Sequence, residues 1–189
     1  MIRTFLLLPL LVMGSAACDV PAQACSGKPR NSVAAGGPAK PIPALTGRVV
    51  DQADLLSAQA EATLGARLAA LEKATTDELV VVTVPSLENE PIEDLGLRLG
   101  NGWGIGKKSV DNGVLLIVAP GEKRARIEVG YGLEGLLTDE RAAQILKEQA
   151  LPNFARGRFE RGVSEGVAAI AATLESDRTR PRCREKAAA

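Results

Sequence analysis

Two nearly uninterrupted apolar runs, residues 79–84 and 114–119, constrain the fold of this chain more than any other feature of its sequence. Short runs of this kind are typical of strands that are buried on both faces of a sheet. The segment between them has Pro91 at its start, followed by apolar residues at helical spacing. Strand, helix and strand joined in this order predict two parallel neighbours in one sheet.

A third strand follows the second run after a Pro120-Gly121 turn. Residues 124–129 alternate charged and apolar side chains, which is typical of a half-exposed strand. The short connection predicts that this strand returns antiparallel as a β-hairpin. A short strand is also expected at residues 47–50, and a glycine-rich loop at residues 100–113.

Helices are expected on both sides of this sheet. Ser57 and Thr138 are suited to be N-caps, because each precedes a segment with apolar residues at helical spacing. A last helix should carry Phe159, Val163 and Val167 on one face. The predicted fold class is α/β: a small three-layer α/β/α sandwich, residues 46–175, with a mixed, mainly parallel sheet and one β-hairpin.

The first 24 residues are typical of a secretory signal. Arg3 provides a positive start, and residues 5–13 form an apolar stretch too short to span a bilayer as a mature helix. Cleavage after Ala17 would leave Cys18 to carry a lipid, as in a lipoprotein, and cleavage after Ala24 would not. Both sites stay open, and either one predicts an exported protein, periplasmic or lipid-anchored at the cell envelope.

The predicted domain is flanked by segments of a different composition. Residues 25–45 are rich in Pro and Gly and are expected to form a linker. Residues 176–189 are basic and are expected to be disordered. Whether Cys25 pairs with Cys183 stays open. Any tie to the membrane is expected to run through a lipid on Cys18.

Composition excludes several classes of function. The chain has no histidine, so a Ser-His or Cys-His nucleophile and a His-ligated metal are ruled out. Residues 47–174 hold 14 Lys and Arg against 19 Asp and Glu, a net charge of about −5. Because an acidic domain repels phosphate backbones, no nucleic-acid partner is expected.

Polar residues precede both buried runs and follow residues 124–129. Parallel strands begin at the same edge of a sheet, and the hairpin strand returns to that edge. Clustered carboxylates repel unless a cation or proton intervenes, and their hard oxygens favour Ca²⁺ or Mg²⁺. We therefore expect a metal-binding group, called here the acidic rim: Asp77, Glu78, Asp111, Asn112, Glu134 and Asp139.

A structural interpretation of the acidic rim stays open beside the metal site. Residues 111–113 form a common turn sequence, and Asp139 suits the first turn of a helix. The rim also lies opposite the carboxyl ends of the parallel strands, where ligands usually bind in open α/β sheets.

Two strings in this region resemble the TPM domain family: residues 111–118 (DNGVLLIV) and 126–135 (RIEVGYGLEG), followed by Leu137-Thr138-Asp139. The resemblance extends over nearly all of residues 47–174. It implies an α/β/α sandwich. Members of the family include acid phosphatases, calcium-binding proteins and non-enzymatic modulators of membrane complexes.

The resemblance also implies site positions, in the 111–113 turn and the stretch 128–134. The expected catalytic residues are Asp111 and Glu134. The expected ligand-binding residues are Asn112, Gly113, Arg126 and Tyr131.

Two functions remain in competition. The first is an envelope accessory or binding module that supports a membrane protein complex, with calcium as its expected ligand. The alternative is a metal-dependent acid phosphatase acting on phosphomonoesters, in which a cation polarises a phosphoryl oxygen and a carboxylate acts as base.

Overall fold

The structure is a computed structural model that describes residues 41–176. The predicted signal segment, the lipidation of Cys18, the Cys25–Cys183 pair, most of the linker and the basic tail from residue 177 lie outside the described residues.

The sheet has four strands in the order β1-β2-β3-β4. They are β1 (Val49–Asp51), β2 (Glu78–Thr83), β3 (Gly113–Ala119) and β4 (Arg124–Val129). The first three strands are parallel, with Glu78 opposite Gly113, and β4 pairs antiparallel with β3. The two apolar runs and the hairpin are therefore confirmed as a mixed, mainly parallel sheet.

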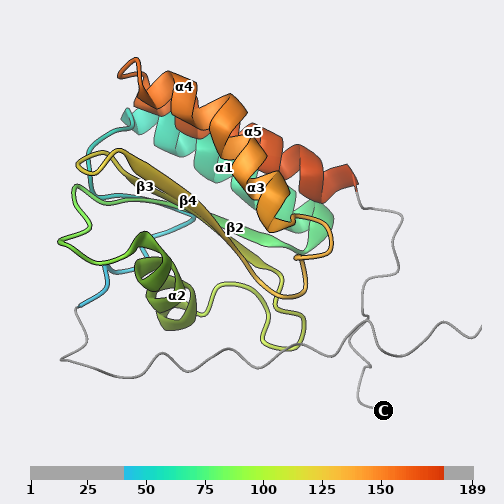
Figure 1. Cartoon of the computed structure of the whole chain (residues 1–189). Coiled ribbons are helices and arrows are strands. Elements are labelled where there is room, and N and C mark those ends of the chain that lie inside the picture. The colour runs from blue at the N-terminus through green and yellow to red at the C-terminus, as the bar shows by residue number, and fades with distance from the viewer. Residues whose placement is uncertain (1–40, 177–189) are drawn as a thin grey trace, which may run out of the picture.

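Helices cover both faces of the sheet (Figure 1). The helix α2 (Ile92–Trp103) lies on one face. The other face is covered by α1 (Ala58–Thr75), α3 (Asp139–Ile145), η1 (Leu146–Ala150), α4 (Leu151–Phe154) and α5 (Phe159–Ser176). The predicted small α/β sandwich is confirmed. No helix within residues 41–176 combines the length and apolar content needed to cross a membrane.

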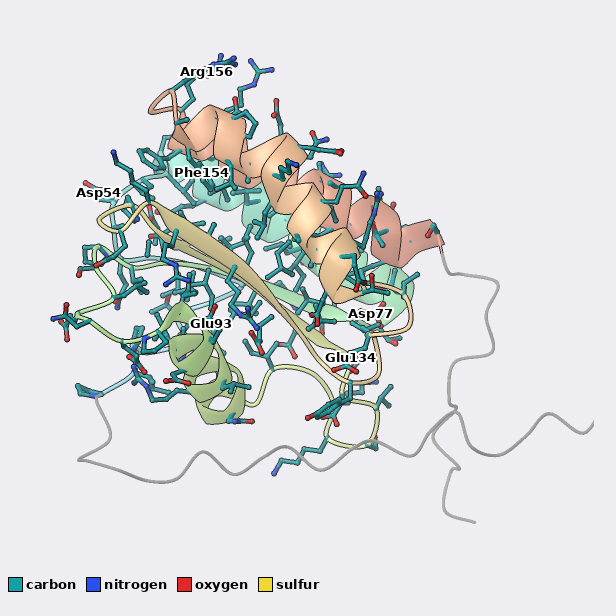
Figure 2. All side chains as sticks on the ribbon, viewed as in Figure 1. Asp54, Asp77, Glu93, Glu134, Phe154 and Arg156 are labelled. Carbon is teal, nitrogen blue, oxygen red and sulfur yellow. The ribbon has the colours of Figure 1, made fainter. Side chains whose placement is uncertain are left out.

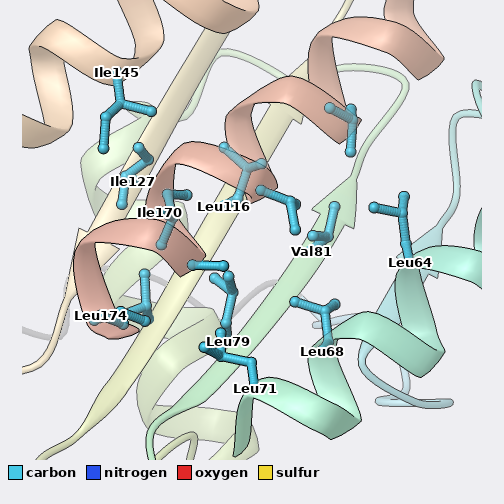
Figure 3. Close-up of a cluster of buried hydrophobic side chains, with 14 of the residues drawn as sticks. Leu64, Leu68, Leu71, Leu79, Val81, Leu116, Ile127, Ile145, Ile170 and Leu174 are labelled. Atoms are coloured by element: carbon cyan, nitrogen blue, oxygen red, sulfur yellow. The ribbon is translucent and has the colours of Figure 1, made fainter. Parts of the chain in front are cut away.

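Alternate side chains of the central strands supply two separate cores. On one face, Val81 and Leu116 pack with Leu68 of α1 and Ile170 of α5, and all four side chains are fully buried (Figure 3). On the opposite face, Val82 and Ile117 belong to a second core that Leu95 and Leu99 of α2 complete. Since burying one such side chain contributes about 1.5–3 kcal/mol, both faces are strongly held.

The two parallel crossovers have opposite hands. Each advances by one strand in the same direction, from β1 to β2 and from β2 to β3. Two such steps of the same hand would put their helices on the same face, but α1 and α2 lie on opposite faces (Figure 1). One crossover is therefore left-handed, against the strong general preference for right-handed connections.

The predicted helix starts are confirmed at both caps. The hydroxyl of Ser57 accepts a hydrogen bond from Ala60 N at 3.2 Å, and that of Thr138 accepts one from Arg141 N at 3.2 Å. The loop prediction for residues 100–113 is wrong at its start, because α2 continues to Trp103. Trp103 packs on the second core and its Nε1 donates to Pro43 O at 2.8 Å. These contacts outweigh the low helix propensity of glycine.

Candidate acidic pocket between α2 and the β-hairpin

One end of the sheet carries the start of β2, the start of β3 and the end of β4. The register fixes this arrangement, since Gly113 lies opposite Glu78, and Val129 lies opposite Val114. Figure 2 shows Asp77 and Glu134 at this end, with Asp54 and Arg156 at the opposite end. The predicted acidic rim divides here into two groups with different environments.

The inner group consists of Asp77, Glu78 and Asn112. At its centre is Asn112, a residue that is only 2% exposed. Its Nδ2 donates to Thr76 O at 2.5 Å and to Asp77 Oδ1 at 3.4 Å. Its Oδ1 accepts from Lys107 N at 2.9 Å. The Asn112 amide thus fastens the start of β2 to the loop that precedes β3.

Glu78 has a similar role at the start of β2. Its Oε2 accepts a hydrogen bond from Gly106 N at 2.8 Å, and its own N donates to Asn112 O at 3.0 Å. Together with Asn112, this carboxylate holds the loop of residues 104–112 against the sheet. A carboxylate bound to a backbone N–H is a stable arrangement without a metal.

The glycines in the two family-like strings are required by close backbone packing. A Cβ on Gly130 would overlap the carbonyl of Asp111, and one on Gly132 would overlap the carbonyl of Val110. Gly132 N also donates to Asp111 O at 3.1 Å. The end of β4 therefore lies directly on the turn before β3, which brings the outer acidic residues to one place.

The outer group consists of Asp111 and Glu134. It lines a pocket of about 110 Å³ between α2, the start of β3 and the end of β4. Asp111 and Glu134, the predicted catalytic pair, both line it. Gly113 and Tyr131 line it as well, and an apolar wall comes from side chains such as Leu97 and Ile105. The turn before β3 and the segment after β4 therefore lie together at one site, as the strand directions predict.

Glu128 is a third carboxylate in this pocket, and the sequence implies it only as one member of the site stretch 128–134. Its Oε2 accepts a hydrogen bond from Arg126 Nε at 2.6 Å. A second nitrogen of the same guanidinium, Nη1, lies 3.6 Å from Glu93 Oε1 of α2. The alternation in residues 124–129 predicts only a half-exposed face. Gly96 in the middle of α2 is the signal that a β4 side chain approaches the helix there.

Asp139 is the predicted rim residue that does not join either group. It is exposed, it is the first residue of α3, and it does not line the pocket. Arg126 stands beside the pocket through its ion pair with Glu128.

The described residues contain no group of three or more Cys, Asp or Glu side chains that could hold a metal ion. Ca²⁺ usually takes six to eight oxygen ligands. A calcium ion at this pocket would therefore depend on backbone carbonyls and water for most of its ligands, with Asp111 and Glu134 supplying charge.

Residues 49–173 match the family model of the TPM domain. This chain belongs to the TPM domain family. The match covers all four strands and nearly all of α5, so the family likeness seen in the two short strings extends over the whole folded domain.

Solved structures support the assignment. The N-terminal domain of a P. gingivalis protein is 38% identical, with a TM-score of 0.65, over 69% of this chain and 83% of that chain. A Bizionia argentinensis protein is 21% identical, with a TM-score of 0.56, over 64% and 82% of the two chains. The N-terminal domain of a Corynebacterium glutamicum protein is 13% identical, with a TM-score of 0.56, over 80% and 95%.

At these identities the second and third likenesses show the fold alone. No curated protein matches this TPM chain.

Proposed function

We propose that this TPM protein is an exported accessory module that binds a component of a membrane protein complex at the cell envelope. The observation that carries the proposal is the pocket between α2 and the β-hairpin, with Asp111 and Glu134 on its wall. Its volume of about 110 Å³ is well below the roughly 300–1,000 Å³ of pockets that enclose small-molecule ligands. An ion or a single side chain fits this space better than a substrate does.

Calcium is the proposed ionic ligand of this pocket. Asp111 and Glu134 offer hard oxygen ligands, and the turn that holds Tyr131 and Glu134 offers backbone carbonyls. The chain has no histidine to favour zinc or another borderline metal. Mg²⁺ is the second candidate, and its smaller radius demands a stricter octahedral geometry.

A calcium titration followed by thermal melting tests this ligand. An ion at roughly a hundred times its dissociation constant should stabilise the protein by about 2.7 kcal/mol. We expect the melting temperature of the wild type to rise, and that of an Asp111→Asn, Glu134→Gln double variant to stay constant. Glu175→Gln, an exposed change in the last turn of α5, is the matched control. Equal shifts in all three proteins, or none at all, would remove calcium from the proposal.

The accessory role is tested by recovery of a partner from envelope extracts. The wild type and Glu175→Gln should recover the same membrane protein, and the double variant should recover much less of it. If the three proteins give indistinguishable recoveries, the pocket is not where the partner binds.

A metal-dependent acid phosphatase is the second candidate function, and Arg126 favours it. Its guanidinium pairs with the pocket residue Glu128, and from there it could hold a phosphoryl oxygen. A bound cation would polarise the phosphoryl group. Asp111 would accept a proton from the attacking water as the water oxygen bonds to phosphorus and the phosphorus–alkoxide bond breaks, and the alkoxide would take a proton from solvent and leave as the alcohol. Hydrolysis of p-nitrophenyl phosphate that is lost in chelator and in Asp111→Asn would support it, and activity unchanged by both would refute it.

Export is part of the proposal and is tested by cell fractionation. A Cys18→Ala variant examined by metabolic labelling with palmitate then decides between the two cleavage sites. Label that depends on Cys18 would indicate a lipid-anchored protein, and unlabelled protein in the periplasmic fraction would indicate cleavage after Ala24. Protein retained in the cytoplasm would contradict export.

A further inference from the structure

The pocket is amphipathic in a way that a simple ion site does not require. Leu97 of α2, Ile105 and Val129 contribute to an apolar wall, and the glycines at positions 96 and 100 also line the pocket. Asp111 and Glu134 also line the pocket. An apolar wall next to two acids suits a ligand with a hydrocarbon stem and a positively charged end.

The charge of the pocket is only partly balanced within the described residues. Glu128 is paired with Arg126, and the distance between Glu128 Oε2 and Arg126 Nε is 2.6 Å. Among residues 41–176, no Lys or Arg lies within ion-pair distance of Asp111 or Glu134. Two negative charges are therefore available to a cation that enters from outside.

We propose that this pocket receives one Lys or Arg side chain of the partner protein. The inference rests on the proposed binding function and names the chemistry of the partner. The methylene groups would lie against Leu97 and Ile105, and the charged end would pair with Asp111 and Glu134. Tyr131, which also lines the pocket, offers an aromatic ring to the same cation.

The surroundings of the pocket favour a protein segment as the bearer of this side chain. The strand β4 is at the edge of the sheet order, and its last residues, Glu128 and Val129, line the pocket. An extended segment can pair with an edge strand through main-chain hydrogen bonds and place alternate side chains into an adjacent pocket. A free metal ion would use the carboxylates but gain nothing from the apolar wall.

The proposal is tested with two synthetic pentapeptides, acetyl-Ala-Ala-Lys-Ala-Ala-amide and the same peptide with norleucine in place of lysine. Binding is followed by the amide chemical shifts of the full chain during titration. We expect the lysine peptide to bind at least tenfold more tightly than the norleucine peptide, with the largest shifts at Gly130, Tyr131 and Glu134. Asp111→Asn with Glu134→Gln should abolish that preference, and Glu175→Gln should leave it unchanged.

A Leu97→Ser variant separates this proposal from a plain cation site. It should weaken the lysine peptide about tenfold and leave the calcium response unaltered, because it removes only apolar wall. Thermal melting of each variant establishes that it is folded. If calcium binds but the two peptides do not differ, or if Leu97→Ser lowers both responses equally, the side-chain proposal is wrong while the calcium site stands. If the lysine peptide binds as described and calcium does not, the side-chain proposal stands and the calcium ligand falls.

Discussion

Gly96 of α2 lies directly against Glu128 of β4, so that a Cβ added to the glycine would be 3.1 Å from Glu128 Oε2. The same Cβ would be 3.1 Å from Ile117 Cδ1 in the second core. The glycine thus sets how closely the helix approaches the strand. It leaves the room in which Glu128 reaches Arg126 beside the pocket.

Gly96→Ala should destabilise the domain by about 1 kcal/mol, because overpacking at a buried site outweighs the gain in helix propensity. Gly65→Ala in α1 is the matched control, since no atom lies within 4 Å of its added Cβ. That variant should gain about 0.5–1 kcal/mol. Urea denaturation measures both. A Gly96→Ala protein as stable as Gly65→Ala would show that the contact between helix and strand is loose.

Gly132→Ala should destabilise the domain by about 1–3 kcal/mol, because the new methyl group overlaps the backbone carbonyl of Val110. Gly135, three residues later, has no atom within 4 Å of an added Cβ. Gly135→Ala should therefore stay within about 0.5 kcal/mol of the wild type. Differential melting of the two variants checks this. Similar melting temperatures would mean that the close packing of the hairpin on the turn before β3 is not required.

Asn112→Ala should cost about 2–3 kcal/mol, because it removes a buried amide that hydrogen-bonds to Lys107 N and Thr76 O in two separate segments. Gln59→Ala, an exposed change on α1, is the control and should stay within about 0.5 kcal/mol. Chemical denaturation gives both values. Should Asn112→Ala also behave as a surface change, the amide would not hold the loop to the sheet.

Acid should weaken the junction between the N-termini of α1 and α5 through Glu160. The hydrogen bond from Ser57 N to Glu160 Oε2 lowers the pKa of this carboxyl below its ordinary value of 4.5, and the Ser57 side chain lowers it further. A lowered pKa in the folded state contributes stability above the unfolded value, and this stability is lost as the pH falls through the folded pKa. Melting temperatures should therefore fall less steeply below about pH 4.5 in Glu160→Gln than in the wild type. Parallel curves for the two proteins would contradict this assignment.

The layers of the domain could be predicted from the sequence because periodicity reports burial directly. The apolar runs predict β2 and β3, and the alternation in residues 124–129 predicts β4. The opposite hands of the two crossovers could not be predicted. An amphipathic pattern shows that α1 and α2 each have a buried face, but not which side of the sheet that face covers.

Only the part of the candidate site that depends on strand order and direction could be predicted from the sequence. Strand direction alone places Asp111 and Glu134 at one end of the sheet, and both line the pocket. The burial of Asn112 and the ion pair of Glu128 depend on the path of the loop before β3 and on the position of α2. Those are tertiary contacts, which leave no periodic trace in the chain.

Within the described residues α2 is the one helix on its face of the sheet, and it also forms a wall of the pocket. A ligand that displaces this helix from the sheet must loosen the packing of Leu95 and Leu99 on the strands beneath it. Occupancy and core stability are therefore linked through a single element. The only tryptophan of the chain, Trp103, is the last residue of that helix. Its fluorescence should therefore change when a ligand in the pocket moves α2.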